Sequence, residues 1–274
     1  MRPGTVKLFS SKRLLVASLD AARSVRLLLF MFLVILTGAG ISAESGVQTF
    51  RDADGIWAKY DYREVATPEG FANNPALVHE FYNLRRAGLP EVEPNAAHLA
   101  LAELEEALTA RGDRFLLITQ NVDDLHARAG SKAILQMHGS IAHARCSFCG
   151  QEHEWPGDLS TETPCLSCES VGGMRPAVVW FGEMPRHMAE IEAAVSQATH
   201  FVAIGTSGTV YPAAGLAAEA RASGAAPFSS ISNAPRMWAC STTTFSAPLH
   251  AKCRAGPKTS FPAIERVPHA ETFG

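Results

Sequence analysis

Four cysteines have the residue type and spacing to bind a metal ion. They form two Cys-x-x-Cys pairs separated by fifteen residues, Cys146 with Cys149 and Cys165 with Cys168. Two such pairs can surround one zinc ion with a tetrahedron of thiolates. Four thiolates leave no coordination position for water, so we expect this zinc to hold structure and not to take part in catalysis. The polar, turn-rich segment between the pairs is typical of a small zinc-ribbon lobe.

A glycine-rich loop is the second chemically informative feature. Residues 32–36 are a continuous apolar run, which predicts a buried parallel strand. The run leads into a Gly-x-Gly-x-x-Ala loop, which contains Gly38, Ala39, Gly40, Ile41 and Ser42. Glycines in such a loop let the backbone approach a pyrophosphate, whose charge is met by amide groups at the start of a helix. Alone, the motif is a weak indicator of dinucleotide binding.

Two further apolar runs predict strands that end in polar or small residues. Residues 114–119 precede Gln120, Asn121, Val122 and Asp123, and residues 200–204 precede Gly205, Thr206 and Ser207. Strands with such ends suit a ligand crevice at the carboxyl edge of a parallel sheet.

Three helices are expected between and after these strands, over residues 95–110, 190–198 and 213–223. In the first, Leu101, Leu104 and Leu108 share one face, and we expect Glu103, Glu105 and Glu106 to face solvent.

The composition limits the class of protein. The chain has 274 residues, 47% of them hydrophobic and 19% charged, which is ordinary for a globular protein. A net charge of −3 argues against nucleic acid as the main partner. The longest apolar run, residues 27–36, is too short to span a bilayer, so we expect no membrane partner. The cysteine pattern indicates a reducing compartment, and we expect the cytoplasm.

Residues 1–30 differ in composition from the rest of the chain. They contain six Lys and Arg residues, several Ser residues and one acidic residue, Asp20, which is similar to an organelle transit peptide. We favour a different interpretation, in which translation begins at Met31, because that residue directly precedes the first predicted strand.

Seven motifs occur in the order found in sirtuins. They are Gly38 to Ser42, Phe50-Arg51, Gln120 to Asp123, His138-Gly139, the four cysteines, Phe181-Gly182-Glu183 and Gly205-Thr206-Ser207. The chain resembles a sirtuin from about residue 32 to about residue 226. The resemblance implies an α/β fold: a Rossmann-like parallel sheet with helices on both faces, a zinc lobe at about residues 140–178, and an acyl-lysine tunnel between them.

The resemblance also implies NAD as the cofactor and acyl-lysine proteins as substrates. The acyl oxygen attacks the ribose carbon that bears nicotinamide, and neutral His138 takes a proton from a ribose hydroxyl. Asn121, Asp123 and Gln120 would position the nicotinamide and its ribose, and Arg51 with the Gly38–Ser42 loop would contact the phosphates. Phe50, Trp57, Val122 and the residues 205–207 complete the expected cofactor site. The expected peptide site comprises Val179, Phe181, Gly182 and Glu183, whose backbone groups would pair the peptide as an added strand.

Within the family, Tyr82 and Arg85 resemble the Tyr-x-x-Arg pattern of the bacterial-type desuccinylase and demalonylase branch. On a helix, residues three apart share a face. A guanidinium and a phenol hydroxyl can bind a carboxylate at the end of an acyl chain. Deacetylation also remains open.

The sirtuin pattern stops after Ala226. A sirtuin should continue with a strand that carries Asn-Leu-Glu, whereas residues 227–274 form a Ser-, Thr- and Pro-rich tail. The codons that can encode residues 227–233 permit Val-Gln-Leu-Asn-Leu-Glu in a shifted frame, so a frameshift is one explanation of the tail and a natural disordered extension is the other. If the tail is real, a core strand is missing or altered, and NAD affinity and solubility should fall.

Four other functions stay open on the sequence alone. They are a hydride-transferring NAD oxidoreductase, a non-enzymatic zinc module, an ADP-ribosyltransferase and a sirtuin-like protein inactivated by its tail. Tyr82 and Arg85 favour deacylation over ADP-ribosyl transfer. We expect a monomer.

Overall fold

The computed structural model describes residues 30–48 and 59–227. Three residues of the expected cofactor site, Phe50, Arg51 and Trp57, lie outside these ranges, as do residues 1–29 and the tail from residue 228. The expectations for the start of translation, the frameshift and the altered tail therefore fall outside the described residues.

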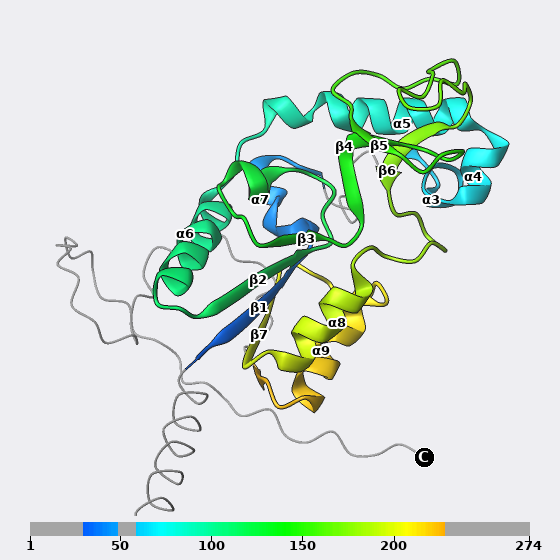
Figure 1. The fold of residues 1–274 in the computed structure, drawn as a ribbon. Helices are drawn as coiled ribbons and strands as arrows, with labels where there is room; N and C mark the ends of the chain where they lie inside the picture. Colours follow the sequence, from blue (N-terminus) through cyan, green and yellow to red (C-terminus); the bar gives the residue numbers. More distant parts are fainter. Residues whose placement is uncertain (1–29, 49–58, 228–274) are drawn as a thin grey trace, which may run out of the picture. The chain divides into compact units, whose positions relative to one another are not determined.

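A parallel sheet of five strands forms the centre of the larger lobe (Figure 1). Its strands lie in the order β3-β2-β1-β7-β8. Their bounds are β1 Phe32–Thr37, β2 Arg114–Thr119, β3 Ile134–Gln136, β7 His200–Ile204 and β8 Ala226–Pro227. All six residues of β1 are buried, as a central strand covered on both faces requires. The three strands predicted from apolar runs are confirmed.

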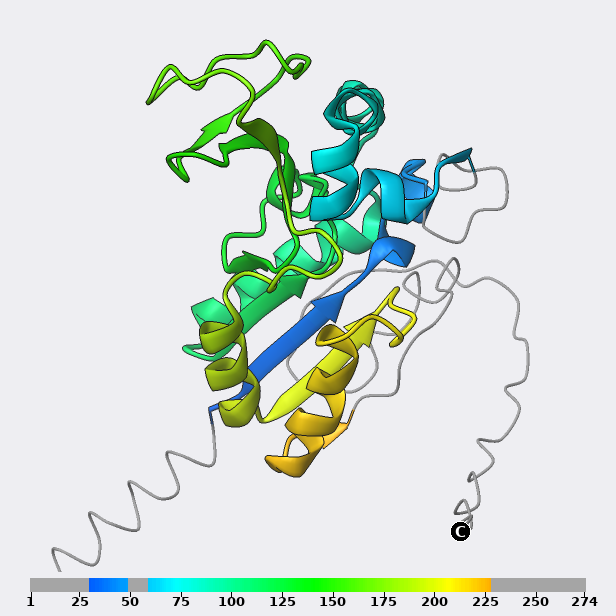
Figure 2. The same cartoon turned by 90° about the vertical axis from the view of Figure 1, so that its right-hand side faces the viewer.

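Helices cover both faces of this sheet (Figure 2). Helix α6 (Ala96–Ala110) packs on one face through Leu101 and Leu108. Helices α8 (Met188–Gln197) and α9 (Ala213–Ala222) pack on the other, through residues such as Ile191 and Leu216. Each side of the sheet therefore has its own apolar core, and the predicted doubly covered α/β fold is confirmed.

Glu105 of α6 does not face solvent as its position among acidic residues suggested. Its side chain is buried, and its carboxylate accepts hydrogen bonds from the backbone N–H groups of Lys132 (2.9 Å) and Ala133 (2.8 Å). The expectation for Glu105 was wrong because these two donors are far away in the sequence. The residue anchors the turn that leads into β3.

A second, antiparallel sheet forms the smaller lobe that was predicted at about residues 140–178. Strand β4 (Gly139–Cys146) lies between β5 (Glu152–Glu154) and β6 (Met174–Val178). Its small apolar core includes Cys146, Leu159, Cys165 and Met174. Two of the cysteines are thus part of the core of this lobe.

A group of short helices lies between the first strand and α6. Helices α3 (Tyr62–Val65), α4 (Pro68–Asn73) and α5 (Pro75–Ala87) are capped at their N-termini by the side chains of Asp61, Thr67 and Asn74. The 3₁₀ turn η3 (Leu89–Glu91) follows α5, and the short helix α7 (Leu125–Arg128) follows β2. The side chains of Phe81 and Tyr82 in α5 are fully buried against Ile141, Val178 and Trp180. Among the described residues, no helix is long and apolar enough to cross a membrane.

Candidate functional site

The loops after β1, β2 and β7 meet at the carboxyl edge of the parallel sheet (Figure 1). Gly38 N–H donates to the carbonyl of Ile204 at 3.0 Å, and Gly40 N–H donates to the carbonyl of Gly205 at 2.9 Å. The structure therefore brings together the two glycine-containing segments that the sequence placed in the cofactor site.

Glycine is required in this loop because the two segments approach so closely. A Cβ atom on Gly38 or on Gly40 would lie 2.9 Å from the carbonyl oxygen of Gly205, which is closer than packed atoms tolerate. The loop continues as two 3₁₀ turns, η1 (Ala39–Ile41) and η2 (Ala43–Ser45), and not as the regular helix expected of a phosphate loop. Ser42, which separates the two turns, is buried, and Gly46, which ends the second turn, adopts a left-handed φ of 90°.

Ser42 links two of the predicted cofactor residues. Its side chain is fully buried, and Oγ accepts a hydrogen bond from Asn121 Nδ2 (2.9 Å) and donates one to Asp123 Oδ2 (3.0 Å). Asp123 also accepts from the backbone N–H of Leu125. Burial raises the pKa of Asp123, while these hydrogen bonds act in the opposite direction. The network fixes the side chains that follow β2.

Two buried histidines lie beneath this network, and sequence reasoning did not identify them. His98 Nε2 lies 3.4 Å from Ser42 Oγ, and His126 Nε2 lies 3.0 Å from Thr37 Oγ1. Their rings meet edge to face with centroids 4.7 Å apart. Burial lowers the pKa of His98 to about 4 and that of His126 to about 3, the second helped by the neighbouring His98. Both rings are therefore neutral near pH 7.

His138 follows β3 and is the predicted base. Its Nδ1 lies 3.0 Å from the backbone carbonyl of Gln120. Because a carbonyl can only accept, Nδ1 carries the proton, and Nε2 keeps a lone pair. Burial lowers the pKa of His138, so its ring is neutral at physiological pH. These are the protonation state and the tautomer that a general base needs.

Gln120 joins the base to the third loop. Its side-chain Nε2 donates to Thr206 Oγ1 at 2.9 Å, while its carbonyl is the partner of His138. Ser207 Oγ lies 2.7 Å from Thr209 Oγ1 in the same loop. Val122 differs from its neighbours, since its side chain packs against the apolar cluster of α5 and its carbonyl accepts from Ile141 N–H.

The expected peptide-binding segment leads away from β6. Val179 N–H donates to the carbonyl of His138, and Phe181 N–H donates to the carbonyl of Ala66, both at 2.9 Å. Phe181 is 43% exposed, and Gly182 has open space around it. Both carboxylate oxygens of Glu183 accept hydrogen bonds from the guanidinium of Arg175 (2.6 and 3.0 Å).

Tyr82 and Arg85 lie together on α5. The Arg85 guanidinium carbon is 5.8 Å from the centre of the Tyr82 ring, and the phenol oxygen accepts from Trp180 Nε1 at 3.1 Å. Arg85 and Asp123 also interact by charge, each favouring the ionised form of the other. Arg85 therefore lies close enough to the network that follows β2 to interact with Asp123, while the hydroxyl of Tyr82 is bonded to Trp180.

The four cysteines fit a zinc ion. The Sγ atoms of all four lie within 4.8 Å of one another, with Cys146 and Cys168 at 3.8 Å and Cys149 and Cys165 at 3.6 Å. Four sulfurs placed about 2.3 Å from a central zinc would be about 3.8 Å apart.

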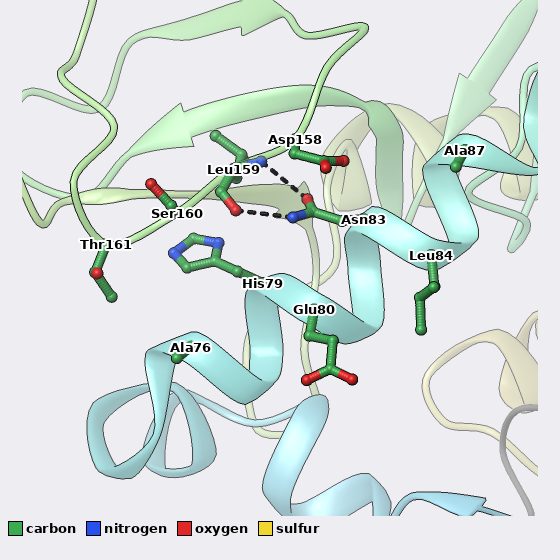
Figure 3. A pocket seen from close by; sticks show the side chains of 10 residues that line it. All are labelled: Ala76, His79, Glu80, Asn83, Leu84, Ala87, Asp158, Leu159, Ser160 and Thr161. Carbon is green, nitrogen blue, oxygen red and sulfur yellow. Dashed lines mark hydrogen bonds between the residues drawn. The ribbon is translucent and has the colours of Figure 1, made fainter.

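A different face of α5 contacts the zinc lobe. Asn83 donates to the carbonyl of Leu159 (2.8 Å) and accepts from its N–H (2.9 Å), as Figure 3 shows. Beside this pair lies a cavity of about 440 Å³, lined by α5 and residues 158–161. Arg86 adds a hydrogen bond to the carbonyl of Gly157 at 3.3 Å. The helix that carries Tyr82 and Arg85 is thus held on two sides.

Comparison with known proteins identifies the family. The Sir2 family pattern matches residues 38–212, which is more than half of the chain. The chain belongs to the Sir2 family. NAD-dependent protein deacylases are among its relatives: that of Caulobacter vibrioides is 59% identical over 72% of this chain and 82% of its own length. The corresponding protein of Salmonella typhimurium is 60% identical over 70% of each chain.

Solved structures of this family show the same fold. A Sir2 homolog in complex with NAD is 41% identical and has a TM-score of 0.65 over 73% of this chain and 77% of that chain. A Sir2 protein with a deacetylated p53 peptide and 3′-O-acetyl ADP ribose is 34% identical, with a TM-score of 0.60 over 73% and 81% of the two chains. The resemblance predicted from the seven motifs is confirmed.

Proposed function

We propose that this Sir2-family chain removes acyl groups from lysine side chains of proteins in a reaction that consumes NAD and gives nicotinamide, O-acyl-ADP-ribose and free lysine. The observation that carries this proposal is His138, a neutral imidazole whose Nδ1–H is tied to the carbonyl of Gln120 and whose Nε2 keeps its lone pair. The relatives named above are NAD-dependent protein deacylases, which favours this reaction over hydride transfer or ADP-ribosyl transfer.

The chain's own residues fit a bound dinucleotide. The loop of Gly38 and Gly40 packs directly on Gly205, which places the backbone of both loops and the hydroxyl groups of Thr206 and Ser207 side by side, where they can contact phosphates. Asn121 and Asp123 are held in place by Ser42, so they can orient a nicotinamide and its ribose without first ordering themselves. Bound NAD would supply the ribose carbon that accepts the acyl oxygen, with nicotinamide as the leaving group. His138 Nε2 would take the proton of a ribose hydroxyl.

The base is tested by His138→Ala. A positioned general base contributes roughly a hundredfold or more, so nicotinamide release in the presence of an acetyl-lysine peptide should fall at least about 100-fold. Thermal stability and zinc content should stay close to those of the wild type, because His138 does not contact the zinc lobe cysteines. His153→Ala, a histidine of β5 in that lobe, is the matched control and should retain activity. Turnover by His138→Ala near the wild-type rate would remove His138 from this role.

The acyl group that fits best is one with a terminal carboxylate, such as succinyl or malonyl. Support comes from α5, where a buried phenol and a guanidinium face the same region. Burial raises the pKa of Tyr82, so its hydroxyl keeps the proton that a carboxylate accepts. Arg85 supplies the positive charge. Acetyl groups lack the carboxylate and make neither contact. We therefore expect a lower kcat/KM for acetyl-lysine than for succinyl-lysine.

Arg85→Met tests this specificity. Removing one partner of a desolvated charge pair costs about 3 kcal/mol, which is a factor of roughly 100. We expect the ratio of kcat/KM for succinyl-lysine to that for acetyl-lysine to fall by about this factor. Arg63→Met, at an arginine whose side chain is 73% exposed on α3, should leave the ratio unchanged. An unchanged ratio in Arg85→Met would reject the assignment.

We further propose that the protein works as a monomer in the cytoplasm. A zinc ion held by thiolates is compatible with a reducing compartment, where structural disulfides are rare. Size-exclusion chromatography with light scattering would test the monomer. The catalytic domain is proposed to span residues 31–226, and sequencing of the gene around codon 227 would test the frameshift.

A further inference from the structure

Trp180 donates hydrogen bonds through both of its N–H groups, and one of them goes to the predicted acyl site. The residue follows β6 and is 3% exposed. Its backbone N–H donates to Glu183 Oε2 at 2.8 Å, and its indole Nε1–H donates to the hydroxyl of Tyr82 at 3.1 Å. The second bond joins residues 98 positions apart in the chain.

This bond determines what the hydroxyl of Tyr82 can do. An indole N–H is only a donor, so the phenol oxygen must act as the acceptor. The phenol has a single hydrogen, which is then directed away from Trp180. Arg85 lies over the same phenol ring. The hydroxyl hydrogen and the guanidinium can therefore serve one acceptor together.

Trp180 itself is held rigidly. The guanidinium carbon of Arg175 lies 3.3 Å from the centre of the Trp180 ring system. The two terminal nitrogens of the Arg175 guanidinium donate to the carboxylate of Glu183, and that carboxylate also accepts a hydrogen bond from the backbone N–H of Trp180. Trp180 is thus held at its backbone N–H, at its ring face and at its indole N–H, which leaves this buried side chain little freedom to rotate. The indole N–H thus arrives at Tyr82 already oriented.

We propose that Trp180 is a positioning residue that sets the preference for acyl chains ending in a carboxylate, and that it acts through the hydroxyl of Tyr82. This inference rests on the acyl specificity proposed above. Trp180 does not contact the substrate. It fixes the direction of the Tyr82 hydroxyl hydrogen, so the phenol meets a carboxylate without first giving up rotational freedom.

Trp180→Phe keeps an aromatic ring and removes the N–H. We expect the succinyl-to-acetyl ratio of kcat/KM to fall about fivefold, the effect of losing one hydrogen bond, and to fall mainly through KM for the succinyl peptide. Tyr82→Phe should lower the same ratio. The double variant should fall no further than Tyr82→Phe, because the indole has nothing left to orient.

Trp155→Phe is the matched control. It also loses one indole hydrogen bond, from Nε1 to the carbonyl of Asp158 at 3.1 Å, but has no contact with Tyr82. Its succinyl-to-acetyl ratio should equal that of the wild type. If Trp180→Phe does not fold, Trp180 can be replaced with benzothienylalanine, which lacks the N–H and keeps the bicyclic volume. The succinyl-to-acetyl ratio of kcat/KM then tests the proposal in the same way.

The possible failures can be told apart. If the wild type does not process succinyl-lysine, the proposed acyl specificity is wrong and the role of Trp180 falls with it. If Tyr82→Phe lowers the ratio but Trp180→Phe leaves it unchanged, only the role of Trp180 is wrong. The role of Trp180 would also be wrong if the fold-changes of the two single variants multiplied in the double variant. Trp180 would then act independently of Tyr82.

Discussion

Mild acid should destabilise this protein through the two buried histidines beneath the site. His98 and His126 have folded-state pKa values of about 4 and about 3, whereas an unfolded histidine titrates near about 6.5. The folded-state values are depressed, so the unfolded state binds more protons between about pH 6.5 and pH 4. The contribution of the two neutral histidines to the free energy of unfolding is therefore fully present above about pH 6.5, and it is lost as the pH falls from there toward about 4.

The size of the effect follows from linkage. One pKa unit corresponds to about 1.4 kcal/mol, so each ring lowers the free energy of unfolding by at most about 1.2 kcal/mol between pH 7 and 5.5. Solvent screening reduces this limit. Asp123 acts in the opposite sense, because burial raises its folded-state pKa and the folded state then takes up its proton first. A variant must therefore isolate the histidine contribution.

His98→Gln serves this purpose. Glutamine at this third position of α6 can keep the capping interaction with the backbone N–H of Asn95 but cannot be protonated. Urea unfolding at pH 7 and 5.5, in buffer with zinc, should show a pH-dependent loss of stability that is smaller than in the wild type by up to about 1.2 kcal/mol. His187→Asn, at an exposed histidine with a left-handed φ of 59°, should keep the wild-type loss. Equal losses in His98→Gln and the wild type would refute the reasoning.

Two further predictions concern the zinc lobe. Chelation of zinc should unfold the lobe around its four cysteines and lower the melting temperature of the protein by at least about 10 °C, and added zinc should restore it. The prediction is wrong if elemental analysis shows that zinc is gone and the melting curve is unchanged. Asn83→Ala removes both hydrogen bonds to Leu159 and should cost about 2 kcal/mol in urea unfolding, whereas Asn73→Ala, at an exposed residue of α4, should cost little.

The elements that read correctly from the sequence are those with local signals. Strands β1, β2 and β7 are continuous apolar runs with a polar residue or glycine after them, and that pattern depends only on neighbours in the chain. The spacing of the two Cys-x-x-Cys pairs likewise predicts a metal site, and their four sulfur atoms do lie close together. The role of His138, by contrast, is expected from the sirtuin resemblance, because its place after a strand and before a glycine would not by itself indicate a base.

Long-range polar contacts explain what the sequence did not reveal. Glu105 looks like its solvent-facing neighbours, and only the fold brings the N–H groups of Lys132 and Ala133 to it. The glycine loop reads as the start of a helix, but it forms two 3₁₀ turns, and Ser42 between them accepts a hydrogen bond from Asn121, 79 positions away in the chain. No periodicity in a single segment can signal such pairs, because both partners must be placed first.

Arg85 connects acyl recognition with the cofactor network, and this affects how its variants must be read. Its positive charge favours the ionised form of Asp123, against the effect of burial. Loss of this charge therefore raises the pKa of Asp123 further, and Asp123 is hydrogen-bonded to Ser42 beside Asn121. If Arg85 only binds the acyl carboxylate, the pH profile for acetyl-lysine should be unchanged in Arg85→Met. A profile whose acidic limb moves to higher pH would show that Arg85 also keeps Asp123 ionised, so the succinyl-to-acetyl ratio must be compared at a pH above that limb.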